Sequence, residues 1–106
     1  MRRGSTPTNT FTLPMDLSQA TVYISYEQGN RIVIEKTNAD LTFAEDQQTH
    51  TFTITLTLTQ EETLAFVPGE VLIQIRYVFA NGDADASNII RTTFERIIKD
   101  GVIRAV

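Results

Sequence analysis

Cysteine and tryptophan are absent from this 106-residue chain, and histidine occurs once, at His50. Without cysteine there can be no disulfide, no thiolate nucleophile and no cysteine-ligated zinc or iron–sulfur cluster. No apolar run approaches the roughly 20 residues that a membrane-spanning helix needs. The basic start Met1–Gly4 is also not followed by an apolar run. We therefore expect neither a membrane partner nor a secretory signal. Stability must then come from burial, from backbone pairing or from partner subunits.

The charge balance is acidic, with 9 basic and 13 acidic residues and a net charge of −4. Binding to bulk nucleic acid needs a basic patch that displaces counterions, so nucleic acid is not an expected partner. Apolar residues make up 42% and charged residues 21% of the chain, which is typical of a globular protein. The length corresponds to one domain.

Threonine is abundant, with 16 residues, and its placement is regular. Every odd position from Thr49 to Thr59 is threonine, while Phe52, Ile54, Leu56 and Leu58 occupy even positions. Side chains alternate between the two faces of a strand, so this segment has one threonine face and one aliphatic face. A one-sided strand of this kind predicts an antiparallel sheet whose aliphatic face is buried.

The same alternation recurs along the chain and predicts strands at residues 8–13, 21–27, 31–37, 41–43, 49–59, 71–79 and 87–96. Gln28–Asn30 and Asn81-Gly82 are hairpin turn signals. Thr59 and Glu62 have the spacing of a capping box, which predicts one helical turn through Leu64. The strand at 71–79 is apolar on both faces, so we expect it to be central.

Seven short strands separated by turns predict an all-β fold, an immunoglobulin-like antiparallel β-sandwich with one short helical turn. The expected domain spans residues 8–96. Residues 1–7 form an N-terminal arm, and residues 97–106 form a C-terminal extension. We call this last segment the C-terminal extension throughout.

The C-terminal extension is rich in aliphatic residues and follows the strand that should complete the sandwich. It could fold back on its own domain, or it could dock on a neighbouring subunit, as exposed apolar surface often does. Arg2 and Arg3 could contact an acidic partner surface or nucleic acid, or they could be solvated. The candidate interface residues are Arg2, Arg3, Ile97, Ile98, Val102 and Ile103.

Residues with catalytic or binding chemistry do not form a complete motif. His50 lies at a strand end, and no serine has the context of a nucleophile elbow. Asn81, Asp83, Asp85 and Ser87 alternate like calcium ligands, but Ala86 and Thr92 replace the required glycine and glutamate. We therefore expect no catalytic, cofactor-binding or metal-binding residue, and no cofactor.

Two further groups have an ordinary structural explanation. The acidic pairs Glu45-Asp46 and Glu61-Glu62 fit a solvated loop and a helix N-terminus. The three tyrosines could form a sugar-binding platform or could pack within the sheets. They are Tyr23, Tyr26 and Tyr77.

The pattern of turns and strand ends resembles a family of short prophage-encoded virion structural proteins. The segments that carry the resemblance are Arg2–Thr8, Phe11–Pro14, Leu58–Leu64, Pro68-Gly69, Gln74–Arg76, Ser87–Ile90 and Arg96–Ile103. The stretch from the capping box through Pro68-Gly69 is also similar to the immunoglobulin-like domains of baseplate proteins. The resemblance implies a tail, neck or baseplate protein located in the virion and made in the cytoplasm of the bacterial host.

We therefore expect a non-enzymatic structural subunit of a bacteriophage particle. It would assemble with copies of itself and with other virion proteins through sheet edges and terminal arms, without a small-molecule substrate. The alternative is a small monomeric binding module that recognises carbohydrate or a host surface through the loops at one end of the sandwich.

Overall fold

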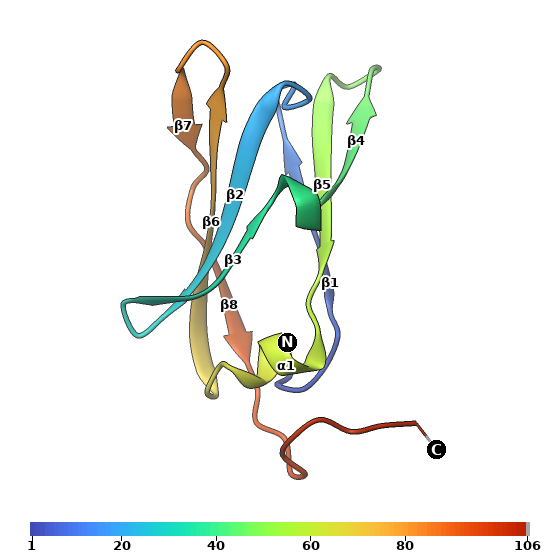
Figure 1. Cartoon of the computed structure of the whole chain (residues 1–106), viewed down its shortest axis with the longest axis vertical. Coiled ribbons are helices and arrows are strands. Elements are labelled where there is room, and N and C mark those ends of the chain that lie inside the picture. Colours follow the sequence, from blue (N-terminus) through green and yellow to red (C-terminus); the bar gives the residue numbers. More distant parts are fainter. Residues whose placement is uncertain (106) are drawn as a thin grey trace.

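The threonine-rich segment forms the middle strand of a three-stranded antiparallel sheet in the computed structural model, which describes residues 1–105 (Figure 1). The strand order is β1-β5-β4, and the bounds are β1 Thr8–Leu13, β5 Thr51–Thr57 and β4 Thr42–Asp46. Phe52, Ile54 and Leu56 are buried, whereas the threonines between them lie on the other face. The predicted register of this segment is confirmed.

The second sheet contains five antiparallel strands in the order β3-β2-β6-β7, with β8 also paired to β6. Its strands are β2 Ala20–Gln28, β3 Arg31–Thr37, β6 Gly69–Phe79, β7 Ala84–Ala86 and β8 Ile90–Phe94. A 3-10 turn, η1 (Asn38–Asp40), connects β3 to β4. β6 has β2 on one side and β7 and β8 on the other, so its predicted central position is confirmed.

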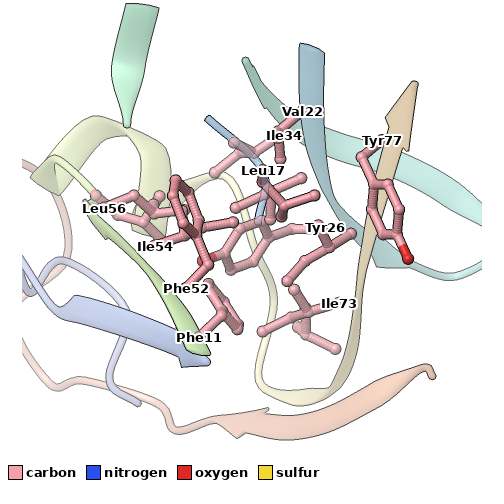
Figure 2. Packing of buried hydrophobic residues seen from close by; sticks show 14 of the residues in the cluster. Phe11, Leu17, Val22, Tyr26, Ile34, Phe52, Ile54, Leu56, Ile73 and Tyr77 are labelled. Carbon is pink, nitrogen blue, oxygen red and sulfur yellow. The ribbon is translucent and has the colours of Figure 1, made fainter. Parts of the chain in front are cut away.

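The two sheets pack face to face, and the predicted all-β sandwich is confirmed. Figure 2 shows Phe11, Phe52 and Ile54 from the first sheet beside Tyr26 and Ile73 from the second. The immunoglobulin-like assignment itself stays a prediction.

The predicted helical turn is α1 (Gln60–Leu64), and it closes one end of the sandwich. The Thr59 hydroxyl accepts a hydrogen bond from the Glu62 amide, and the Glu62 carboxylate accepts one from the Thr59 amide. The predicted capping box is therefore formed. Phe66 follows the helix and is fully buried, with its ring stacked 4.5 Å from that of Phe94. The aromatic pair fills the space between the sheets at this end.

The last predicted strand differs from the observed one. The sequence predicted a continuous strand at residues 87–96, but the structure has β7 before Ser87 and β8 after Ile89. The Ser87 hydroxyl accepts the Ile75 amide, and the Gln74 side chain donates to the Ser87 carbonyl. The Ser87 amide still donates to the Ile75 carbonyl, but the Ser87 hydroxyl takes the place of its carbonyl in the return bond, so regular pairing with β6 is interrupted between β7 and β8.

One hydrogen bond joins the two sheets within the core. The Asn9 amide of β1 donates to the Tyr26 hydroxyl of β2 over 2.7 Å. Tyr26 is fully buried, and this burial raises the pKa of its hydroxyl from 10 to about 12. The phenol is thus held neutral inside the sandwich.

The observed register predicts very different costs for two adjacent substitutions. Ile54→Ala should lower the free energy of unfolding by about 2–5 kcal/mol, because Ile54 is fully buried between the sheets. Thr55→Ala, on the opposite face, should change it by about 0.5 kcal/mol or less. Urea denaturation of both variants checks this. Equal effects would contradict the register.

Tyr26 should make stability depend on alkaline pH. Its folded pKa of about 12 exceeds the unfolded value of 10, so the stabilisation is complete below pH 10 and is lost as the pH rises toward 12. The loss should reach about 2–3 kcal/mol. Tyr26→Phe lacks the Asn9 bond at every pH but should lose less stability over this window. Chemical denaturation at each pH measures the free energy of unfolding. An equal loss of this free energy between pH 10 and pH 12 in the two proteins would contradict the expectation.

Candidate functional site

Residues 97–105 of the C-terminal extension combine aliphatic and charged side chains and are largely exposed. The extension leaves β8 at the α1 end of the sandwich and runs beyond this end, below α1, toward the side on which β1 and β5 lie (Figure 1). Ile98 is 94% exposed, Ile103 55% and Val102 39%. Ile97 is half-buried, and a Cβ added at Gly4 would lie 3.2 Å from its Cδ1 atom. Gly4 also has φ = +76°, so glycine permits both the turn and this close contact.

The backbone of the extension is held by Gln60 of α1. The Gln60 amide nitrogen donates to the Ile103 carbonyl over 3.1 Å, and the Ile103 amide donates to the Gln60 oxygen over 2.9 Å. The side chain thus pairs with both backbone groups of one residue, as a neighbouring strand would. The peptide is fixed in place while the Ile103 side chain remains exposed.

Arg3 joins the N-terminal arm to α1 and to the extension. Its guanidinium donates to the Leu64 carbonyl over 3.0 Å, to the Phe66 carbonyl and to the Asp100 carboxylate over 3.2 Å. The last carbonyls of a helix have no intrahelical donor and carry partial negative charge, so a cation is favourable there. The Arg3 side chain therefore forms its hydrogen bonds within its own domain.

Arg2 lies beside Arg3 but faces solvent. It forms an exposed ion pair with Glu95 at 3.3 Å, and its backbone forms a parallel bridge with the same residue. The Glu95 amide donates to the Met1 carbonyl, and the Arg3 amide donates to the Glu95 carbonyl. Residues 1–3 thus extend the second sheet beyond β8. The predicted arm at residues 1–7 is bound to its own domain at this point.

A groove that was not predicted from the sequence lies on the outer face of the second sheet. Its volume is about 400 Å³, and it crosses β3, β2 and β6. We call it the outer-face groove. The strand registers place three rows of side chains across this face: Thr37, Tyr23 and Arg76; Glu35, Ser25 and Gln74; Ile32, Glu27 and Leu72. All of these except Thr37 line the groove, together with Ile73 and Ile89.

A β-bulge brings Ile32 to the outer-face groove. Ile34 pairs with Tyr26 and is buried, whereas Ile32 pairs with Glu27 and is 53% exposed. Regular pairing would put both isoleucines on the same face, because side chains two residues apart point the same way. The extra residue, Val33, shifts the register and places Ile32 outside. Ile89 reaches the groove from the interrupted segment between β7 and β8.

The other candidate groups are dispersed over the molecule. His50 is exposed in the β4–β5 turn with φ = 54°. Tyr23 faces outward and Tyr26 is buried in the core, so the three tyrosines do not form one platform. Within residues 1–105, no three His, Cys, Asp or Glu residues are grouped in a way that could hold a metal ion. No helix in this part of the chain has the length and apolar character to cross a membrane.

The acidic pairs have local partners. The Asp46 carboxylate accepts backbone amides of Thr49 and Gln48, which lowers its pKa and closes the β4–β5 turn. Burial alone would raise the pKa of Glu62, but hydrogen bonds from Lys36 and the Thr59 amide together lower it. Glu62 thereby connects the capping box of α1 to β3 through Lys36.

Arg3 and Arg2 provide a matched pair for testing the attachment of the N-terminal arm. Arg3→Ala should lower the free energy of unfolding by about 2–3 kcal/mol, because it leaves the carbonyls of Leu64 and Phe66 without their charged donor. Arg2→Ala removes only an exposed ion pair and should cost about 0.5 kcal/mol or less. Chemical denaturation of the two variants measures the difference. Equal costs would show that the Arg3 bonds do not stabilise the fold.

Comparison of the chain with protein-family models, with curated proteins and with solved structures finds no match in any of the three.

Proposed function

We propose that this chain is a non-enzymatic structural subunit that self-assembles through its C-terminal extension. The observation that carries the proposal is the exposure of Ile98, Val102 and Ile103 on a peptide whose backbone is already bound by Gln60. Exposed aliphatic side chains on an ordered segment favour association, because burying them releases water at little further cost in chain entropy. Arg2, which is exposed beside this end, adds a charge to the same surface.

The proposed setting is a bacteriophage particle, at the tail, neck or baseplate. This part of the proposal rests on the resemblance of the turns and strand ends to prophage virion proteins. In such a particle the neighbours would be further copies of the chain and other virion proteins. The edge strands β1, β3 and β4 offer additional backbone groups for contacts between subunits.

A second candidate function is supported by a pocket of about 270 Å³ at the β6–β7 end. Its lining combines aromatic rings with carboxylates, which suits recognition of a polar ligand with an apolar face, such as a sugar. The lining residues are Met15, Tyr77, Phe79, Asp83, Ala84 and Asp85. A monomeric binding module would use this pocket and would not need the extension.

Ile98→Asp should abolish self-association without unfolding the chain, because Ile98 has almost no contact with its own domain. Val67→Asp is the control, since Val67 is also an exposed aliphatic residue at the α1 end but lies outside the extension. Sedimentation velocity over a dilution series should show oligomers for the wild type and for Val67→Asp, and monomers for Ile98→Asp. Circular dichroism verifies that each variant is folded.

A wild-type chain that remains monomeric over the whole dilution series would contradict self-assembly and favour the binding module. A chain truncated after Arg96 gives an independent measurement. It should remain folded and monomeric. Normal assembly of the truncated chain would show that the extension is not the connector.

A further inference from the structure

We propose that the C-terminal extension of one copy of this chain docks in the outer-face groove of a second copy. This inference rests on the proposed self-assembly and identifies the surface that receives the extension. The C-terminal extension is a bound peptide with exposed aliphatic side chains. The outer-face groove has exposed aliphatic and aromatic side chains.

The outer-face groove is more apolar than the outer face of the first sheet. Tyr23 is 41% exposed, and Ile32 and Ile89 are each 53% exposed. On the first sheet, the corresponding face consists largely of threonines, which are compatible with water. Burying the outer face across β3, β2 and β6 would therefore release more free energy than burying the outer face of the first sheet.

The charges of the two surfaces are complementary. The outer-face groove carries Glu27 and Glu35, which lie in adjacent rows, and Arg76, which lies beside Tyr23 at the other end. The extension carries Lys99, Arg104 and Asp100. Asp100 is paired with Arg3 of its own domain, so the charges available to a partner are the two basic ones. An acidic groove then receives a basic, aliphatic peptide.

The extension lies away from the groove of its own domain. As β8 runs from Ile90 to Phe94, its partners on β6 change from Ile73 to Gly69, so the chain moves away from the groove residues Gln74 and Arg76. It then runs below α1, beyond this end of the sandwich, toward the side on which β1 and β5 lie (Figure 1). Gln60 and Arg3 hold it there. Docking in the same domain would break these bonds, whereas a second copy can supply a groove without breaking them.

Ile98 is the natural anchor for this contact. It is the most exposed large aliphatic side chain of the described residues. Ile32 and Leu72 flank Glu27 in the third row of the groove. An aliphatic side chain packed over this row would contact Ile32 on one side of Glu27 and Leu72 on the other, and Lys99, next in sequence, would reach the carboxylates of Glu27 and Glu35. The contact uses side chains on a sheet face, so the backbone edge of β3 stays free.

The absence of cysteine from the chain allows a direct test of this contact. Ile32→Cys and Ile98→Cys are prepared as separate full-length proteins, mixed and treated with a short bismaleimide. Both positions are exposed, so neither substitution should disturb folding. Proteolysis and mass spectrometry should identify a peptide pair that joins residue 32 to residue 98. The control mixture combines Val67→Cys with Ile98→Cys and should give at least about tenfold less cross-linked product.

A second measurement uses Ile32→Asp, with Arg31→Asp as the adjacent control outside the groove lining. Ile32→Asp should weaken self-association by about thirtyfold or more, as the loss of a buried aliphatic anchor does. Arg31→Asp should change it by less than about threefold. Sedimentation equilibrium gives both values, and circular dichroism verifies folding.

The outcomes separate this proposal from the function on which it rests. Association that depends on Ile98 but not on Ile32, without a 32–98 cross-link, would overturn docking in the groove and leave the extension as the connector. A wild-type chain without self-association would overturn both. A 32–98 cross-link together with weaker association of Ile32→Asp supports both.

Discussion

The burial of Phe66 at the open end of the sandwich is the interaction on which the surrounding structure depends. Its ring stacks on Phe94 and lies 6.3 Å from the ring of Tyr26, so it packs against side chains of both β2 and β8. Phe66 follows α1 directly, and its burial anchors the chain just after this single turn, which is too short to be stable alone. Lys36 and the capping box secure the same turn from the other side.

Once α1 is fixed, its polar groups position both ends of the chain. The carbonyls at its end accept the Arg3 side chain, and Gln60 binds the backbone of Ile103. Thr63, which is fully buried, donates its hydroxyl to the Ser5 carbonyl. A five-residue helix therefore contributes hydrogen bonds to both terminal segments. The proposed assembly surface depends on core packing through these bonds.

The fold follows closely from local sequence patterns. The alternation in Thr51–Thr57 determines which face is buried, and the Thr59–Glu62 spacing defines the helix start. The break at Ser87–Ile89 was not predicted, because there a serine hydroxyl accepts the Ile75 amide in place of the Ser87 carbonyl, and a glutamine side chain donates to that carbonyl. Hydrogen bonds of this kind depend on which residues face each other across β6, and a single strand does not reveal that.

The candidate surfaces could be predicted only in part. The aliphatic composition of the extension is visible in the sequence, and Ile98 and Ile103 are exposed as an interface would require. The outer-face groove was missed because Ile32 and Ile34 have the same parity, and only the bulge at Val33 separates them. Arg3 was considered a possible partner contact, yet its acceptors lie more than 60 residues away in sequence. Such distant pairings leave no periodic signal.

Gly101 gives the extension a bend with φ = +87°, between the segment that follows β8 and the residues bound by Gln60. If the extension and the groove are the two halves of one contact, the contact is heterologous, because each copy offers one of each. Every open assembly then ends in an empty groove and a free extension. The direction set at Gly101 decides the rotation from one copy to the next, and that rotation determines whether the assembly closes into a ring or continues as a filament.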